Sequence, residues 1–280
     1  MLVRLHDGSA VDAEVHGTGP TVLLPADPKP VEGPKADELR RWGADPALGR
    51  RLIDGLTRRG LRVVAFDYEG HVLAEPKPDT LTPDNVCADI LAVADATGSE
   101  RFAWYGYSWT AVSGLQLAAR TDRLTALVMG GWPPLGAPYA AMLRVTTATH
   151  AMAVSPPAVP EQTGNAWADA EFTMSEPETR QFMTLYQGLQ DFDERAALAK
   201  VRCPRLCVVG GADRIAYDGR WGGVTVDLAA PVTAHRAELE SLGWEVHVLD
   251  GLDHMGAMQA SAVLPVLAPF FARALRDETQ

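Results

Sequence analysis

The segment that most constrains this chain is residues 106–110 (GYSWT), which lies between an apolar run and a helix-forming stretch. Residues 102–105 indicate a buried strand, and residues 111–119 favour a helix. Small residues around Ser108 permit a sharp strand-to-helix turn in which backbone approaches backbone. Such a turn lifts the Ser108 hydroxyl clear of a sheet, in front of a helix N-terminus with unpaired N–H groups. The segment therefore predicts an α/β fold with a serine presented at a strand end.

This arrangement is typical of a nucleophile elbow, and a serine that merely caps a buried helix is the alternative interpretation. The usual elbow has glycine two residues after the serine, whereas this chain has the bulkier, β-branched Thr110. A serine hydroxyl becomes a good nucleophile only when a base removes its proton and an acid orients that base. The choice between the two interpretations therefore depends on partners elsewhere in the chain.

Two downstream segments supply such partners in the loops after predicted strands. Residues 207–213 (CVVGGAD) end in Asp213, and residues 246–254 (VHVLDGLDH) end in His254. Open α/β sheets gather their chemistry in these loops, beyond the carboxyl ends of the strands. Asp213 alone follows a strand and a double glycine, which favours it over four other carboxylates: Asp191, Asp193, Asp218 and Asp253. His254 is favoured over His71, which also follows a strand but precedes the serine.

The order serine, acid, histidine resembles that of the α/β-hydrolase superfamily, in its serine-nucleophile, capped subgroup. The resemblance covers nearly the whole chain: residues 15–20 are similar to the turn before the family's third strand, and residues 63–68 to the fourth strand and its end. It implies Ser108 as nucleophile, His254 as general base and then general acid, and Asp213 as the residue that holds the imidazole. It also implies an oxyanion hole formed by the backbone N–H groups of Trp109 and of Ala26 or Asp27, and we select Asp27.

The chain departs from the family at two places near this expected site. Where the family often has His-Gly-x-Pro after the third strand, residues 25–28 read PADP. Pro25 has no N–H to donate, and an ionised Asp27 carboxylate beside an oxyanion would disfavour it. The arginine-containing turn after the fourth strand is replaced by residues 69–71 (EGH). These changes leave the expected fold intact and weaken the expectation of an ordinary ester site.

Strands that alternate with amphipathic helices predict a mostly parallel sheet with helices on both faces, and the family resemblance implies eight strands. Single helices are expected from residue 45 or 46 to 59 and over 231–242. The alternation stops between residues 132 and 198, where prolines and apolar stretches predict an inserted helical cap rather than a disordered linker. We therefore expect a core domain at residues 1–131 and 199–280, and a cap or lid at 132–198.

The bulk properties exclude several classes of protein. A net charge of −11 argues against nucleic-acid binding, which needs basic patches. No window is apolar enough for a membrane helix, and the first residues lack the pattern of a signal peptide, so a cytoplasmic location is expected. Three cysteines, an odd number, also favour a reducing compartment. Cys203 and Cys207 have no matching Cys/His pair, so we expect packed thiols and neither a metal nor a cofactor.

Together these features predict a cofactor-independent serine hydrolase that acts on a small or medium apolar ester, lactone or thioester through an acyl-enzyme. Two alternatives stay open. The same pocket could run C–C bond cleavage, a lyase reaction or cyclisation to a lactone, with Ser108 only polarising the substrate, or the protein could bind a ligand without turnover. The expected partner is a small apolar molecule, without nucleic acid or membrane; the sequence leaves a homo-oligomer open and does not specify the substrate.

Overall fold

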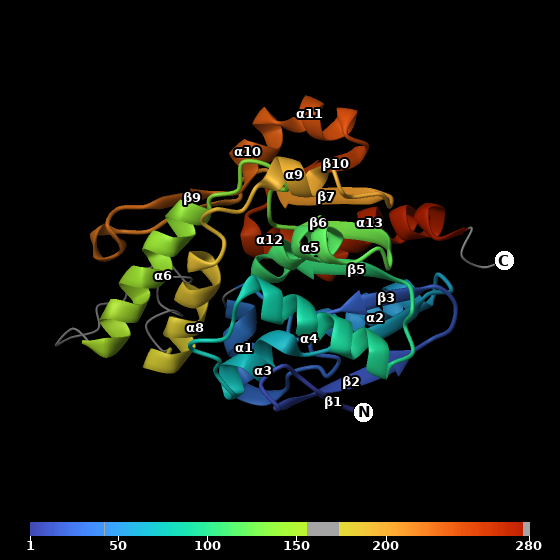
Figure 1. Ribbon diagram of the computed structural model, residues 1–280, viewed down its shortest axis with the longest axis horizontal. Helices are drawn as coiled ribbons and strands as arrows, with labels where there is room; N and C mark the ends of the chain where they lie inside the picture. The colour runs from blue at the N-terminus through green and yellow to red at the C-terminus, as the bar shows by residue number, and fades with distance from the viewer. Residues whose placement is uncertain (42, 156–173, 277–280) are drawn as a thin grey trace.

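The computed structural model describes residues 1–41, 43–155 and 174–276. Its centre is an eight-stranded sheet in the order β1-β2-β4-β3-β5-β6-β7-β10 (Figure 1). The pairs β1–β2 and β2–β4 are antiparallel, and all other neighbours in this sheet are parallel. A separate antiparallel hairpin pairs β8 with β9. The strands are β1 (Leu2–Arg4), β2 (Ala10–His16), β3 (Thr21–Leu24), β4 (Arg62–Phe66), β5 (Phe102–Tyr107), β6 (Leu124–Gly130), β7 (Arg205–Gly210), β8 (Arg214–Ala216), β9 (Thr225–Asp227) and β10 (Trp244–Leu249).

Helices cover both faces of the sheet. On one face α2 (Leu48–Thr57) packs against α13 (Ala260–Ala274), and on the other α4 (Pro83–Ala96) packs against α5 (Trp109–Arg120). Central strands such as β4 and β5 contribute side chains to both apolar layers, because successive side chains of a strand point to opposite faces. The remaining helices are α1 (Gly33–Arg41), α3 (Tyr68–Ala74), α6 (Tyr139–Val154), α8 (Glu176–Gln187), α9 (Glu194–Leu198), the 3₁₀ turn η1 (Gly219–Trp221), α10 (Ala229–Ala234), α11 (Arg236–Ser241) and α12 (His254–Met258).

This architecture confirms the predicted fold class. The prediction of one helix over residues 231–242 was wrong, because α10 and α11 meet at His235, whose backbone leaves the helical region (φ −100°, ψ 12°). The break lets both short helices pack against β10 and bury Val232 and Leu239. The helix expected from residue 45 or 46 begins at Leu48, because the Asp45 carboxylate accepts the Ala47 N–H in a preceding turn. No helix among the described residues is long and apolar enough to cross a membrane.

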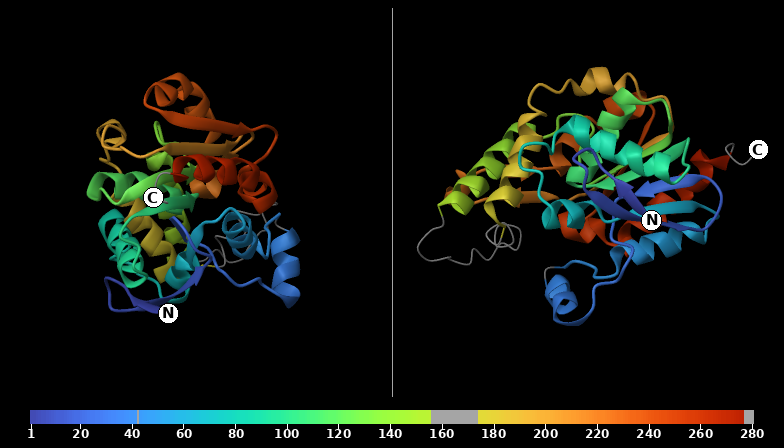
Figure 2. Two further views of the ribbon diagram at one scale, coloured as in Figure 1. Left: turned by 90° about the vertical axis from the view of Figure 1, so that its right-hand side faces the viewer. Right: turned by 60° about the horizontal axis from the view of Figure 1, so that its bottom comes forward.

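Within the predicted cap, α6 and α8 lie side by side beyond one end of the sheet (Figures 1 and 2). Gln181 fixes α8 to the core. Its fully buried amide accepts the Lys77 N–H at 3.0 Å and donates to the Val72 carbonyl at 2.9 Å. Residues 156–173 of the predicted cap lie outside the described residues, and the domain boundary stays a prediction.

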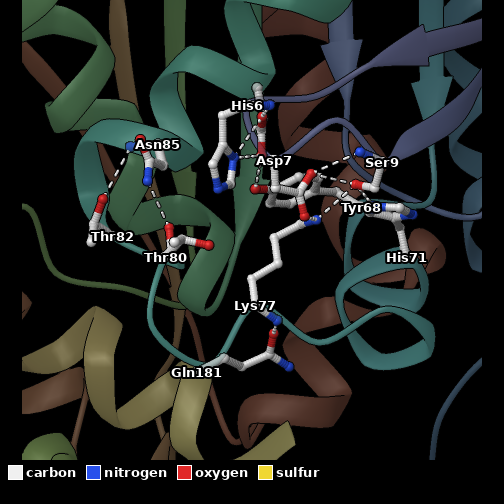
Figure 3. Close-up of polar contacts among 11 residues, drawn as sticks. His6, Asp7, Ser9, Tyr68, His71, Lys77, Thr80, Thr82, Asn85 and Gln181 are labelled. Atoms are coloured by element: carbon white, nitrogen blue, oxygen red, sulfur yellow. Dashed lines mark hydrogen bonds and ion pairs between the residues drawn. The ribbon is translucent and has the colours of Figure 1, made fainter. Parts of the chain in front are cut away.

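A polar network joins the N-terminal hairpin to the chain that leads into α4 (Figure 3). The Lys77 side chain is fully buried, forms an ion pair with Asp7, and donates to Ser9 Oγ at 2.8 Å. Ser9 Oγ in turn lies 3.0 Å from His71 Nε2 on α3. Because a buried ammonium is costly without its counter-charge, this pair ties the hairpin to the core.

Replacement of Asp7 by asparagine is expected to lower the free energy of unfolding at pH 7 by about 1–3 kcal/mol. Burial raises the Asp7 pKa, but hydrogen bonds from Lys77 and Ser9 outweigh it and hold the pKa well below its ordinary value. A carboxylate with a lowered pKa stabilises the fold above its unfolded-state pKa, and this stabilisation fades as the pH falls below about 4.

Urea denaturation at a series of pH values measures this effect. Between about pH 5 and pH 2, the wild type should lose stability more steeply than Asp7→Asn. Asp122→Asn, which changes an exposed carboxylate without an ion pair among the described residues, is the control and should follow the wild type. Equal slopes for Asp7→Asn and the wild type would show that the ion pair does not stabilise the fold.

Candidate active site

Ser108 occupies a strained turn between β5 and α5. It is the one non-glycine residue with a positive φ among the described residues (φ 56°, ψ −130°), a conformation that costs about 1–3 kcal/mol. Its N–H donates to the Gly130 carbonyl at 2.8 Å, and its carbonyl accepts the Ala111 N–H at 2.9 Å. A Cβ on Gly106 would lie 2.5 Å from the Thr110 carbonyl oxygen, so only glycine fits there. The turn has the geometry expected of the predicted elbow and leaves Ser108 partly exposed.

Thr110, the residue that departs from the usual elbow, braces this turn. Its Oγ1 accepts the Tyr107 N–H at 3.0 Å and donates to the Tyr107 carbonyl at 2.8 Å. The side chain is buried and satisfies both backbone groups of the residue before the serine. The larger side chain is therefore accommodated as the hydrogen-bond partner of the backbone next to the strained serine.

Asp213 and His254 meet beyond the ends of two adjacent strands. β7 and β10 are parallel neighbours whose last residues, Gly210 and Leu249, pair with each other. Asp213 follows Gly210 by three residues, and His254 follows Leu249 by five residues. His254 Nδ1 lies 2.7 Å from Asp213 Oδ2. Both side chains are buried: that of His254 is 3% exposed and that of Asp213 is 0% exposed. A Cβ on Gly210 would lie 2.3 Å from the Leu252 carbonyl oxygen, so glycine lets the two loops pack closely.

Tyr107 connects this pair to the elbow. Its hydroxyl donates to the His254 carbonyl at 2.7 Å, and the two rings lie 5.2 Å apart. Burial raises the Tyr107 pKa, so the hydroxyl stays protonated and remains a donor. Gly131 (φ 60°) makes room, because a Cβ there would lie 2.6 Å from the Tyr107 ring and 3.0 Å from His254 Cε1. The contact of Tyr107 with His254 follows from the tertiary structure, since the two residues lie 147 positions apart in the chain.

The rival residues are engaged elsewhere. His71 Nε2 on α3 lies 3.0 Å from Ser9 Oγ, and the Asp253 carboxylate accepts the Gly256 N–H at the start of α12. Asp193 caps α9 in the same way, and Asp218 caps η1 and pairs with Arg220. Asp191 is exposed. Of the five acids that we considered, Asp213 is the one that contacts His254 through its side chain.

The expected oxyanion donors occupy suitable backbone positions. Trp109 is the first residue of α5, so its N–H has no acceptor within the helix. Ala26 donates its N–H to the Leu24 carbonyl, and no described residue accepts the Asp27 N–H. The Asp27 carboxylate accepts the N–H of Lys29, two residues further along the chain, at 2.8 Å. The role of the Trp109 and Asp27 N–H groups as oxyanion donors stays a prediction.

Glu69 is a residue that the sequence analysis did not assign to the site. It lies in the first turn of α3, and its Oε2 accepts the indole N–H of Trp109 at 3.1 Å. Burial raises the Glu69 pKa and the hydrogen bond lowers it; the charge of Asp67 raises it and that of His254 lowers it. A usable signal was present, because Glu69 follows a strand end in the sheet region that carries Ser108.

Within the described residues, no group of three or more His, Cys, Asp or Glu side chains is arranged to hold a metal ion. Cys203 and Cys207 are free thiols, and burial raises their pKa values to about 11 and about 12. Both sulfurs are therefore protonated at neutral pH and behave as packing groups.

Comparisons with known proteins agree with this fold. A family model described as "Alpha/beta hydrolase family" matches residues 15–266. No curated protein matches the sequence. Similar solved structures include a thermophilic esterase from Thermogutta terrifontis (16% identity, 98% of each chain, TM-score 0.65). An enol-lactonase from Burkholderia xenovorans LB400 has 18% identity over 97% of this chain and 99% of that one, with a TM-score of 0.62. An epoxide hydrolase from Vigna radiata has 16% identity over 98% and 97%, with a TM-score of 0.56.

Proposed function

The chain belongs to the alpha/beta hydrolase family, and from this premise we propose that it hydrolyses a small or medium ester, lactone or thioester through Ser108, His254 and Asp213. The observation that carries the proposal is the buried Asp213–His254 pair at 2.7 Å, held beside the strained Ser108 turn by Tyr107. The esterase and lactonase among the similar structures share only the fold at their low identity, so they support the reaction class by analogy.

The arrangement suits a two-step acyl transfer. The Ser108 hydroxyl attacks the acyl carbonyl while the imidazole of His254 takes its proton, and Asp213 stabilises the resulting imidazolium through Nδ1–H. The backbone N–H groups of Trp109 and Asp27 donate to the oxyanion. His254 then gives its proton to the leaving alcohol, activates a water molecule against the acyl-enzyme, and returns Ser108 to its starting state. No cofactor enters these steps.

Covalent labelling tests this proposal directly. A fluorophosphonate should modify one serine per chain, located at Ser108 by peptide mass spectrometry, because only an activated serine attacks it at a useful rate. Turnover of short-chain p-nitrophenyl esters should fall in proportion to the labelled fraction. Full ester turnover by labelled protein, or label found on another serine, would contradict the proposal.

A second candidate function is non-hydrolytic chemistry at the same site, with His254 as base and Ser108 as a polarising group. The charges of Asp27, Asp67 and Glu69 act on one another near the proposed oxyanion donors, which is unfavourable for an anionic tetrahedral intermediate. This candidate predicts that Ser108 resists the fluorophosphonate and that neither esters nor thioesters are hydrolysed. The labelling experiment therefore separates the two functions.

A further inference from the structure

The Tyr107 side chain lies where the serine turn and the histidine loop meet. Its hydroxyl donates to the His254 carbonyl at 2.7 Å, and the two ring centroids lie 5.2 Å apart at an interplanar angle of 56°. Burial raises the Tyr107 pKa most and the charge of Asp213 raises it further, so the hydroxyl keeps its proton. Because Tyr107 directly precedes Ser108, one side chain connects the backbone beside the proposed nucleophile to the backbone of the proposed base.

Two consecutive glycines, at and just beyond the end of β6, make room for this contact. A Cβ on Gly130 would lie 2.6 Å from Tyr107 Cδ2, and a Cβ on Gly131 would lie 2.6 Å from Cε1 and Cζ of the same ring. The Cβ on Gly131 would also lie 3.0 Å from His254 Cε1. A side chain at either position would therefore displace the phenol ring, and one at Gly131 would also crowd the imidazole.

The backbone that carries the phenol is fixed, whereas the helix that carries the imidazole is short. Thr110 Oγ1 binds both the N–H and the carbonyl of Tyr107, and the Ser108 N–H donates to the Gly130 carbonyl at 2.8 Å. His254 is the first residue of α12, which has only five residues. A helix of this length is not stable by itself in water, so the position of His254 depends on contacts from outside α12.

We propose that Tyr107 is a positioning residue for His254, and that its hydroxyl fixes the His254 backbone so that the imidazole can serve both Asp213 and Ser108. This inference rests on the proposed hydrolase function and deepens it by naming the group that places the base. The alternative is that Tyr107 only fills space, a role that needs the ring but not the hydroxyl. Tyr107→Phe distinguishes the two roles, because it keeps the ring and removes the hydroxyl alone.

Tyr107→Phe is expected to lower kcat for p-nitrophenyl butanoate by about 10- to 100-fold and to leave KM within about twofold of the wild type. A small displacement of the base slows both acylation and deacylation but removes no contact with the bound ester. Tyr105→Phe is the matched control, since it is the same substitution on the same strand and face, and the Tyr105 ring also lies beside Gly130. Its kcat should stay within about twofold of the wild type.

Proton NMR reports on the imidazole without any turnover. The Nδ1–H proton that His254 shares with the Asp213 carboxylate should resonate far downfield of the amide protons, because a short charge-assisted hydrogen bond deshields it. Asp213→Asn should remove this resonance and thereby assign it. We expect the resonance to shift, or to broaden through faster exchange with water, in Tyr107→Phe and to match the wild type in Tyr105→Phe.

The two measurements keep the inference separate from the proposed reaction. If no ester is hydrolysed, the hydrolase function fails, but a resonance altered only in Tyr107→Phe would still establish the positioning role. If esters are hydrolysed and Tyr107→Phe matches Tyr105→Phe in kcat, the hydrolase function stands and the positioning role is rejected. A lowered kcat with an unchanged resonance would also overturn the inference, because the hydroxyl would then act without placing the imidazole. A wild type that lacks the resonance would overturn it too, since there would be no fixed imidazole to position.

Discussion

Ser108→Ala is expected to lower kcat/KM for short-chain esters by about 10⁴-fold or more, the largest effect of any single substitution in this chain. The substitution removes the oxygen that attacks the acyl carbon, so only binding and the oxyanion donors would remain. Steady-state kinetics with p-nitrophenyl butanoate measures the loss. Turnover within tenfold of the wild type would reject Ser108 as nucleophile.

Stability measurements separate this loss from misfolding. Ser108→Gly should also be inactive but should raise the free energy of unfolding by about 1 kcal/mol, because glycine adopts φ 56° without strain. Ser113→Ala changes a buried serine further along α5 and should retain turnover. A folded but inactive Ser108→Gly would show that the strained backbone serves the hydroxyl rather than the fold.

Asp213→Asn is expected to lower kcat by about 10⁴-fold, the second largest effect. In the wild type, His254 Nδ1–H donates to the Asp213 carboxylate. The asparagine amide would neither hold the imidazole in the same tautomer nor stabilise its positive charge. Asp213 Oδ1 is buried without a partner among the described residues, so the amide NH₂ would find no acceptor there and would compete for Nδ1. Single-turnover kinetics with an activated ester measures the loss in the acylation step.

Asp253→Asn provides a closely matched comparison, because Asp253 is adjacent to His254 and carries the same charge. Its carboxylate accepts the Gly256 N–H at the start of α12, and asparagine caps a helix about as well as aspartate. We expect its kcat to stay within a few-fold of the wild type. Similar losses for Asp213→Asn and Asp253→Asn would indicate that general charge, rather than the 2.7 Å contact, supports His254.

Much of the fold followed from local patterns. The alternation of strands and helices predicted the mostly parallel sheet. Strands and helices can be recognised from the sequence because their apolar residues recur with a period of about two or about 3.6 residues. The start of α4 also depends on local residues, because Pro83 lies in its first turn and the Thr82 side chain accepts the Asn85 N–H. The break at His235 was missed because α10 and α11 bend to follow β10, which is a tertiary requirement.

Within the candidate site, the sequence identified side chains by type and order, and the structure supplied their contacts. Asp213 and His254 stood out because each follows a strand end, and parallel strands end at the same edge of a sheet. Glu69 also follows a strand end, but its relation to Trp109 depends on how α3 and α5 pack. The same holds for Tyr107, whose hydroxyl reaches a residue 147 positions away along the chain.

The sequence by itself determined the layered fold and the order of Ser108, Asp213 and His254, since both depend on short-range patterns of apolar residues, glycine and chain direction. Tertiary structure alone decided that Thr110 braces the elbow, that the Tyr107 hydroxyl binds the His254 carbonyl, and that the Glu69 carboxylate accepts the Trp109 indole N–H. These features depend on distances between segments far apart in the chain. Such distances are set by the packing of whole helices and strands, which no local pattern encodes.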